Sequence, residues 1–383
     1  MKYDFDTPIE RRGTSSAKWD SAEEELIPLW VADMDFPSPR EVVEALKRRA
    51  DHPVFGYTLE PESFYQSVID WMKRRHGWEI RREWMTYAPG VMPSLNVALL
   101  AYSQPGDKVV IQPPVYYPFR GSVLDNGRQL VENPLVLEGG RYFMDFDQLE
   151  GVIDERTRLL VLCSPHNPVA RVWSRDELGR LAEICAEKDV IILSDEIHHD
   201  LIMKGHRHIP MGSASERAAG VTVVLAAATK TFNLAGLSCS VVIAADERLR
   251  TRFRGAAGRI WTRGVNAFSC LAAETAYRYG ESWLAQVLDY VQGNYDYLVS
   301  FLAERLPGAR VFPMEGTYLA WVDLRALGAS DEELKERILH RARVWLDDGP
   351  MFGTGGSGFQ RINLACARAT LSAALEAMAR ELI

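Results

Sequence analysis

The sequence predicts an α/β protein with a mostly parallel central sheet and a smaller α+β domain. Five short apolar runs rich in β-branched residues indicate the sheet, and amphipathic stretches separate several of them. Strands apolar on both faces, with helices between them, are typical of parallel sheets covered on both sides. At 383 residues, the chain is long enough for two or three domains. The predicted strands lie within residues 107–114, 158–165, 189–198, 221–230 and 238–245.

The other elements separate a large domain from a small one. Residues 1–30 are expected to be irregular, and apolar spacing predicts helices at 40–50, 63–78 and 175–188. The pattern then stays helical from residue 246 to about residue 306. The small unit should contain a hairpin-like pair (309–324), a helix (331–346), a strand (359–366) and a closing helix (369–382). We predict an N-terminal arm (1–49) joining the small domain, a large domain (50–283) and a C-terminal small domain (284–383).

Composition and charge disfavour several classes of partner. The formal net charge is −8 and no basic stripe stands out, which argues against nucleic-acid binding. No uncharged run approaches the roughly 20 residues that a membrane helix needs. The five cysteines are odd in number and mostly lie in apolar runs. We therefore expect reduced thiols in a cytoplasmic protein that binds neither membrane nor nucleic acid.

Polar and aromatic side chains follow the ends of the predicted strands. In open α/β sheets ligands bind outside the carboxyl ends of the strands, so these side chains are expected to converge. Singly, each has a structural explanation, because Asn-Pro forms turns and an aspartate after a strand often caps a helix. The converging residues are Tyr116, Asn167, Asp195, His198, Thr229 and Lys230.

Lys230 is the only charged residue between Ala218 and Ala245. An unpaired buried lysine is costly and lowers its pKa, which leaves an amine able to condense with an aldehyde. In enzymes that use pyridoxal 5′-phosphate (PLP), such a lysine works with an acid that keeps the pyridine nitrogen protonated. Asp195 suits that role.

The other residues suit other parts of PLP. Asn167 and His198 could bind the phenolic oxygen, and Tyr116 could stack on the ring. A helix predicted within 88–102 would present its N-terminus to the phosphate, and Gly90 permits a close approach.

The spacing of these residues resembles a known superfamily. Asp195 follows Asn167 by 28 residues and Lys230 follows Asp195 by 35, as in the fold-type I PLP-dependent superfamily of class I and II aminotransferases. The segments LWVADMDFPSP, PGVMPSLN, LCSPHNPVARVW, SDEIHHDL, ATKTFNLAGL and RINLACARATL resemble its cystathionine β-lyase and cysteine C–S lyase branch. This resemblance covers nearly the whole chain. It implies the aspartate aminotransferase-like fold, PLP, and cleavage of L-cystathionine or related cysteine S-conjugates to a thiol, pyruvate and ammonia.

The resemblance also implies roles for individual residues. Lys230 would link to PLP and shuttle protons, and Arg361 would clamp the substrate α-carboxylate with Asn167 nearby. Tyr57 would reach the phosphate of the neighbouring subunit, which makes the site a property of a homodimer. The remaining cofactor contacts would come from the backbone amides of Val91 and Met92 and the side chains of Tyr116, Asn167, Asp195, His198 and Thr229.

Four positions depart from the usual aminotransferase pattern. Ser238 stands eight residues after Lys230, where an arginine commonly binds the phosphate, and the lyase branch tends to lack that arginine. Ala227 replaces a serine that would supply another phosphate donor. Ala170 and Ala367 stand where a glycine and a proline are usual.

Other functions remain open at this point. An aminotransferase begins its reaction in the same way but needs a second keto acid, and a regulatory protein could retain the fold without turnover. The histidines and acids of 195–200 and 205–208 raise the possibility of a metal, but their spacing resembles no closed zinc site, so we predict none. FGTGGSG (352–358) lacks the lysine of a phosphate loop and is expected to be a flexible loop near Arg361.

Overall fold

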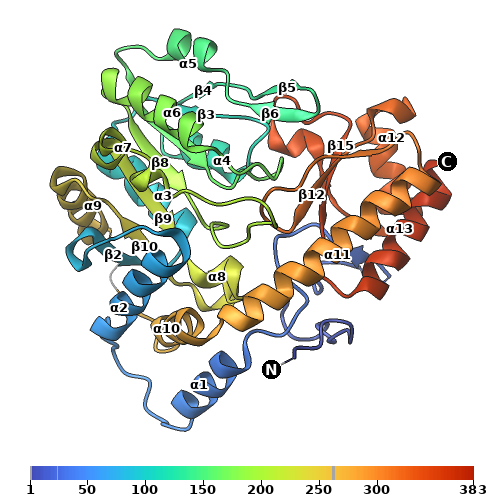
Figure 1. The fold of residues 1–383 in the computed structure, drawn as a ribbon, viewed down its shortest axis with the longest axis horizontal. Helices are drawn as coiled ribbons and strands as arrows, with labels where there is room; N and C mark the ends of the chain where they lie inside the picture. The colour runs from blue at the N-terminus through green and yellow to red at the C-terminus, as the bar shows by residue number, and fades with distance from the viewer. Residues whose placement is uncertain (1, 24, 261–263) are drawn as a thin grey trace.

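The computed structural model describes residues 2–23, 25–260 and 264–383, so parts of the predicted arm and large domain lie outside it. A seven-stranded sheet forms the centre of the larger unit (Figure 1). Five neighbouring strands run parallel, and β10 pairs antiparallel with both β9 and β2. In order across the sheet, the strands are β2 (Met85–Ala88), β10 (Ser240–Ile243), β9 (Thr222–Ala226), β8 (Ile191–Asp195), β7 (Thr157–Cys163), β3 (Lys108–Ile111) and β4 (Gln129–Glu132). The prediction of a mostly parallel sheet is confirmed.

Helices cover both faces of this sheet. On one face α3 (Val91–Tyr102) packs against α9 (Glu247–Arg259), β8 and β9, and on the other α6 (Arg175–Glu187) packs against α7 (Glu216–Val221) and β8. The central strands are apolar because both sides are covered, and Leu159–Leu162 is fully buried. The remaining helices of this unit are α2 (Glu62–Trp71), α4 (Pro118–Asp125), α5 (Phe146–Val152), α8 (Ala228–Thr231) and α10 (Ser269–Tyr279), and β5 (Val136–Glu138) and β6 (Arg141–Phe143) form a hairpin.

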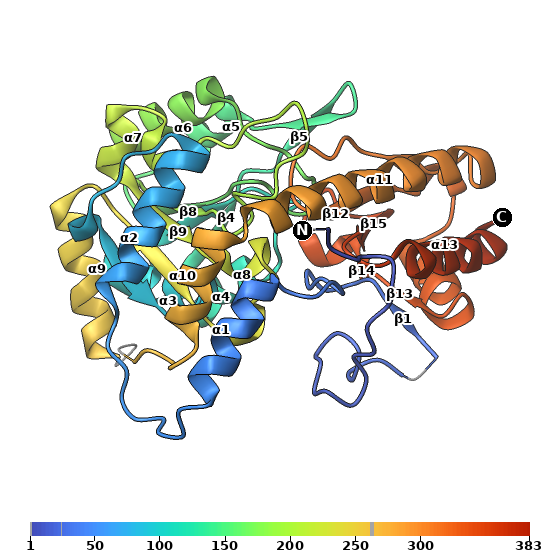
Figure 2. The same cartoon turned by 60° about the horizontal axis from the view of Figure 1, so that its bottom comes forward.

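Four of the strands that follow the long helix α11 (Glu281–Arg305) form a second, antiparallel sheet. The N-terminal arm joins this unit, because β1 (Ile27–Pro28) pairs with β13 (Val344–Trp345), and Figure 2 shows the arm beside it. Helix α1 (Arg40–Ala50) then leads back to the larger unit (Figure 2). The other elements are β11 (Arg310–Val311), β12 (Leu319–Asp323), β14 (Asp347–Asp348), β15 (Phe359–Asn363), α12 (Asp331–Lys335) and α13 (Arg368–Leu382).

Two predicted helices end earlier than expected. The helix expected over 331–346 becomes π-helical at Glu336–Arg341, and β13 takes the last apolar residues. The helix expected over 63–78 becomes π-helical at Met72 and stops at Gly77, whose φ is +68°. The first error arises because a short apolar segment fits a helix or a strand until tertiary pairing decides. The second helix ends because Gly77 adopts the left-handed conformation that commonly terminates helices.

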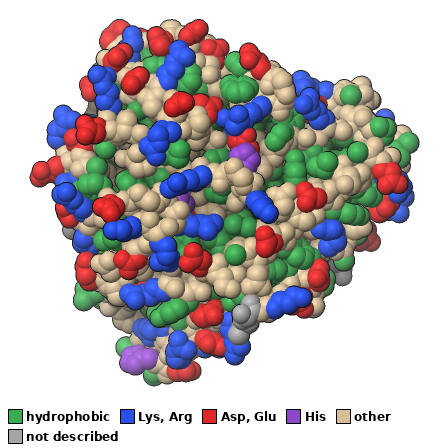
Figure 3. All heavy atoms as spheres, in the orientation of Figure 1, with side chains coloured by type: hydrophobic (Ala, Val, Ile, Leu, Met, Phe, Trp, Pro, Cys, Tyr) green, Lys and Arg blue, Asp and Glu red, His purple; other side chains and the backbone are tan. Residues whose placement is uncertain are grey.

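The outer surface carries charges of both signs. On the face shown in Figure 3, acidic and basic side chains are interspersed without a broad field of one sign. Of the helices in the described part of the chain, none combines the length and apolar composition that crossing a membrane requires.

Candidate active site

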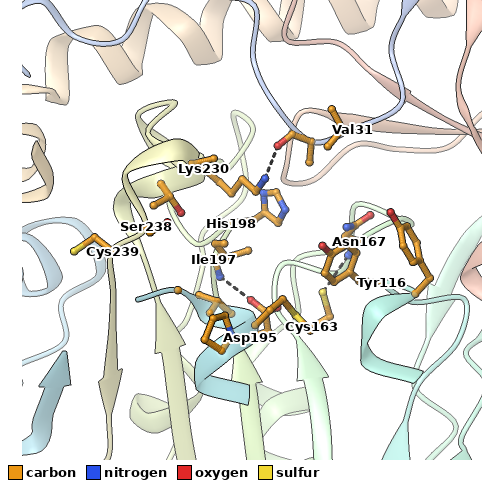
Figure 4. A pocket seen from close by; sticks show the side chains of 18 of the residues that line it. Val31, Tyr116, Cys163, Asn167, Asp195, Ile197, His198, Lys230, Ser238 and Cys239 are labelled. Carbon is orange, nitrogen blue, oxygen red and sulfur yellow. Dashed lines mark hydrogen bonds between the residues drawn. The ribbon is translucent and has the colours of Figure 1, made fainter. Parts of the chain in front are cut away.

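A cavity of about 330 Å³ lies at the carboxyl ends of the parallel strands (Figure 4). Strand β8 ends at Asp195 and β9 leads into α8, which carries Lys230, so the sheet itself brings these residues together. Nine of the ten residues predicted from the sequence line this cavity: Val91, Met92, Tyr116, Asn167, Asp195, His198, Thr229, Lys230 and Arg361. The tenth, Tyr57, does not line it and is fully exposed.

Lys230 presents its amine to the cavity from helix α8. Its Nζ donates a hydrogen bond to the carbonyl oxygen of Ala32, and Figure 4 shows it reaching the loop that contains Val31. Burial lowers the pKa of Lys230 to about 8, while the nearby Asp33 carboxylate acts in the opposite direction. The amine is therefore much easier to deprotonate than an ordinary lysine.

Asp195 lies across the cavity with few donors for its charge. The backbone N–H of Ile197 donates to its Oδ1 at 3.1 Å. Burial raises the pKa of Asp195 to about 7. A cationic N–H donor in the cavity would stabilise the ionised carboxylate, and a protonated pyridine nitrogen is such a donor. Nearby, burial lowers the pKa of His198 well below its ordinary value, and its Nδ1 has no hydrogen-bond partner among the described residues.

The N-terminus of α3 forms the anion-binding end of the cavity. This 12-residue helix begins at Val91, directly after Gly90, and its first backbone N–H groups have no partner within the helix. A Cβ on Gly90 would lie 3.3 Å from Pro93 Cδ, so a side chain there would crowd the helix start. Thr229 and Ser238 line the same cavity. Together they suit a phosphate group.

Arg361 reaches the cavity from the small sheet. It lies on β15, and its Nη1 donates to Asn167 Oδ1 at 2.9 Å. Its Nη2 donates to the carbonyl oxygen of Trp30 at 2.7 Å and to the carboxylate of Asp347. Two residues predicted from distant parts of the sequence thus meet directly, since Asn167 follows a strand of the large sheet.

The structure explains part of the departures from the usual pattern. Ala170 has a φ of +57° and Ser238 a φ of +49°, both in the left-handed region that glycine adopts more easily. The position usually occupied by glycine therefore keeps the same backbone turn with alanine. Ser238 lines the cavity where the phosphate-binding arginine would be expected. Ala367 is the N-cap of α13 with a φ of −56°, a value that proline also adopts.

Sequence reasoning missed two parts of this site. The segment that includes Val31 and Ala32 closes the cavity over Lys230, and Asp347 supports Arg361 from behind. Neither the 31–32 segment nor Asp347 follows a strand of the large sheet, and the site residues were predicted from positions that follow those strands. The resemblance of LWVADMDFPSP could have pointed to the first.

Of the histidines in residues 195–208, His199 joins a buried network around Asp200, whereas His198 lines the cavity and His206 is exposed. Among the described residues, His76, His199 and Asp200 could hold an ion. However, the Asp200 carboxylate already lies 2.8 Å from His76 Nε2 and 3.1 Å from His199 Nε2. It also accepts hydrogen bonds from Trp71 Nε1 and Thr231 Oγ1, each at 2.9 Å. This network packs behind the helix of Lys230, and the absence of a metal remains a prediction.

The donor set of the cavity fits PLP. A buried amine with a lowered pKa, a carboxylate with few donors, an aromatic side chain (Tyr116) and a helix N-terminus surround one space. These match the aldehyde, the ring nitrogen, the ring face and the phosphate of PLP. The fold and the site therefore define a PLP-dependent enzyme with the aminotransferase-like fold.

Comparison with known proteins identifies the family. The chain belongs to the aminotransferase class I and II family, whose profile matches residues 24–378. It is 43% identical over 373 residues to the cystathionine beta-lyase PatB of Bacillus subtilis, with 96% of each chain covered. A PLP-bound structure from Clostridium difficile 630, provisionally described as an aminotransferase, has a TM-score of 0.98 and 42% identity, with both chains fully covered. Cystalysin from Treponema denticola, which contains PLP, has a TM-score of 0.96 and 38% identity over 100% of this chain and 99% of that one.

Proposed function

We propose that this PLP-dependent carbon–sulfur lyase cleaves L-cystathionine or related cysteine S-conjugates to a thiol, pyruvate and ammonia. The observation that carries the proposal is the 43% identity, over almost the full length of both chains, to a cystathionine beta-lyase. The site agrees with it, because Ser238 occupies the place of the arginine that aminotransferases commonly carry. The cavity supports the residue roles that the resemblance implies, because nine of the ten residues concerned line it.

Lys230 is the residue that moves protons. PLP, when bound, supplies an aldehyde for amines and an electron-withdrawing ring that stabilises negative charge at the substrate α-carbon. With PLP bound, the Lys230 amine would hold the cofactor through its aldehyde, and the Nζ atom, when free, would accept the proton of the substrate α-carbon. Its lowered pKa suits this work, since an amine with a pKa of about 8 is roughly one-tenth unprotonated at neutral pH, far more than an ordinary lysine.

Asp195 and its neighbours set the charge of the ring. The Asp195 carboxylate would keep a proton on the pyridine nitrogen of bound PLP, and Asn167 and His198 would bind its phenolic oxygen. The lowered pKa of His198 keeps it neutral, so one ring nitrogen can donate and the other can accept. Tyr116 would pack on the ring face, while Thr229 and the backbone amides of Val91 and Met92 would hold the phosphate.

Arg361 orients the substrate. Its guanidinium binds the α-carboxylate, beside the Asn167 side chain that it already contacts. This contact would restrict how the substrate α-carbon can lie relative to Lys230. In the net reaction, cleavage of the bond between the β-carbon and sulfur, with uptake of one water molecule, would give the thiol, pyruvate and ammonia.

An aminotransferase is the second candidate, because it shares every step up to removal of the α-proton and because a related structure is described as one. One assay separates the two. The PLP-loaded protein is incubated with L-cystathionine or S-methyl-L-cysteine, without a keto acid, and pyruvate and free thiol are measured. Many turnovers with equal amounts of pyruvate and thiol support the lyase. Turnover that starts only when a keto acid is added would contradict it and favour the aminotransferase.

The functional unit is proposed to be a homodimer with shared active sites. Residues 54–59 form an exposed segment that contains Val54, Phe55, Tyr57 and Leu59. Such an apolar segment is unfavourable in water and is typical of a surface that a partner covers. A second copy of the chain would bring Tyr57 to the phosphate of its neighbour.

We also propose a division of the chain into domains and a cytoplasmic location. The arm (1–49) is assigned to the small domain because β1 pairs with β13, and the proposed boundary at 283–284 falls in the first turn of α11. Arg361 and Lys230 then come from different domains, so their separation depends on the domain arrangement. All five cysteines are buried free thiols, which agrees with the proposed cytoplasmic location.

A further inference from the structure

Asp347 lies directly behind Arg361, the residue to which the proposed function assigns the substrate α-carboxylate. The two are cross-strand partners in the antiparallel pair of β14 and β15. Arg361 Nη2 donates to Asp347 Oδ2, and each side chain is only 2% exposed. The strand register therefore fixes a buried carboxylate against the arginine.

The guanidinium has few N–H groups left for a ligand. Nη1 donates to Asn167, while Nη2 donates to both Asp347 and the Trp30 carbonyl oxygen. A bidentate carboxylate uses either both Nη groups or Nε with Nη2, so it needs one of the Nη2 protons. Asp347 is a buried charge fixed by the strand pair, whereas Trp30 offers a neutral carbonyl from the arm. An incoming carboxylate therefore replaces Trp30 and shares Nη2 with Asp347.

We propose that Asp347 is a positioning residue for substrate binding, which fixes the plane of the Arg361 guanidinium and limits how tightly a carboxylate is held there. The inference rests on the proposed function through the role of Arg361. Two carboxylates on one guanidinium repel each other, and this repulsion is strong where water is excluded. The product pyruvate carries the same carboxylate as the substrate. A moderate affinity of Arg361 for a carboxylate therefore orients the substrate and still allows the product to dissociate.

The chain offers a matched set of variants. Asp347→Asn removes the charge but keeps an oxygen that accepts from Nη2, whereas Asp347→Ala removes both. Asp348→Asn is the control, because Asp348 is the next residue on β14 and contacts Gln360 Nε2 at 3.1 Å rather than Arg361. The probe is 3-(methylthio)propanoate, which has the carboxylate and thioether but no amine to react. Its amide serves as the uncharged counterpart.

Binding is measured by titration calorimetry on the PLP-loaded dimer. Asp347→Asn should bind the carboxylate about threefold or more tightly than the wild type, because a like charge is gone. Asp347→Ala should bind the carboxylate about tenfold more weakly than Asp347→Asn. Both variants lack the charge of Asp347, but only asparagine keeps an oxygen that accepts from Nη2 and fixes the orientation of the guanidinium. The amide affinity and the Asp348→Asn variant should stay within about twofold of the wild type.

The inference would be overturned if Asp347→Asn and the wild type bound the carboxylate with equal affinity. It would also be overturned if the substitution changed the affinities for the carboxylate and for its amide by the same factor. If Asp347→Ala lacks the wild-type thermal transition, the comparison of Asp347→Asn with wild type decides alone. Arg361→Ala separates this inference from the proposed function. If Arg361→Ala binds the carboxylate like the wild type, the proposed role of Arg361 fails. If it abolishes binding while the Asp347 variants match the wild type, only the inference about Asp347 is wrong.

Discussion

The carboxylate of Asp195 receives the backbone N–H of Ile197 at 3.1 Å, and no other donor to it is found among the described residues. It therefore lines the cavity as a buried acid whose pKa burial raises to about 7. A carboxylate in such a position favours a ligand that brings a cationic N–H group. This environment supports the proposed pairing of Asp195 with the pyridine nitrogen.

Replacing Asp195 with Asn should lower kcat for β-elimination by about 100-fold or more, because the amide cannot keep the ring nitrogen protonated. The visible absorption band of the lysine-linked cofactor should persist, since Lys230 is unchanged. Absorption spectra and steady-state rates on the same preparation test both expectations. An Asp195→Asn enzyme with wild-type turnover would remove Asp195 from the proposed mechanism.

The stabilisation by PLP should grow with pH between about 4 and 8. In the cofactor-free fold the raised pKa of Asp195 means that its contribution to stability is present at low pH and is lost as pH rises through about 7. Bound PLP supplies the cationic partner and removes this loss. The thermal shift between cofactor-free and PLP-loaded protein should therefore increase with pH in the wild type and much less in Asp195→Asn. Parallel pH profiles for the two proteins would contradict this explanation.

Attachment of the cofactor should accelerate as pH rises through about 8. The amine must be unprotonated to attack the aldehyde, and burial lowers the pKa of Lys230 to about 8. Stopped-flow absorbance after mixing PLP with cofactor-free protein measures this rate. Lys230→Arg keeps a positive charge but cannot form the link, so it should show no lysine-linked band and a loss of turnover of about 1000-fold or more.

Mixing an inactive variant with an impaired one should restore activity if Tyr57 serves the neighbouring subunit. Lys230→Ala inactivates its own site, and Tyr57→Ala weakens the phosphate contact in the partner's site. A mixed dimer would contain one site in which both residues are intact. Co-refolding the two variants should therefore recover activity, up to about one quarter of that of the wild type for random pairing. Activity that stays at the sum of the two separate variants would place Tyr57 outside the site.

The protein should lose stability in acid partly through His166. Its Nε2 lies 2.9 Å from the carbonyl oxygen of Pro114, and burial lowers its pKa to about 4. A depressed histidine pKa means that the unfolded chain binds the extra proton, so stability falls as pH drops from about 6.5 to about 4, by about 3 kcal/mol for this group. Denaturant unfolding of His166→Asn should show a shallower pH dependence, while the exposed His206→Asn should match the wild type.

The strand ends of the large sheet could be predicted from the sequence in useful detail. Apolar runs with β-branched residues predict β7, β8 and β9, and the ligand-binding rule for parallel sheets then predicts that Asn167, Asp195 and Lys230 meet. This works because each of these residues is separated from a buried strand by only a few positions. The local sequence pattern is therefore enough to place each of these residues at the edge of the sheet.

Contacts between distant segments could not be predicted in this way. Ala32 accepts from Lys230 across 198 residues, and Arg361 contacts Asn167 across 194. The antiparallel direction of β10 also has no local signature, since an apolar run is equally compatible with either direction. Such features depend on how complete elements pack.

The alternation of strands and helices, and the residues placed at the strand ends, can be read from local sequence, because burial and turn formation act over a few neighbouring residues. The closure of the arm over Lys230 and the position of Asp347 behind Arg361 are visible only in the folded chain. Both arrangements depend on the register between strands and on the packing of the two units. A carboxylate and an arginine on different strands become partners only when the ladder aligns them.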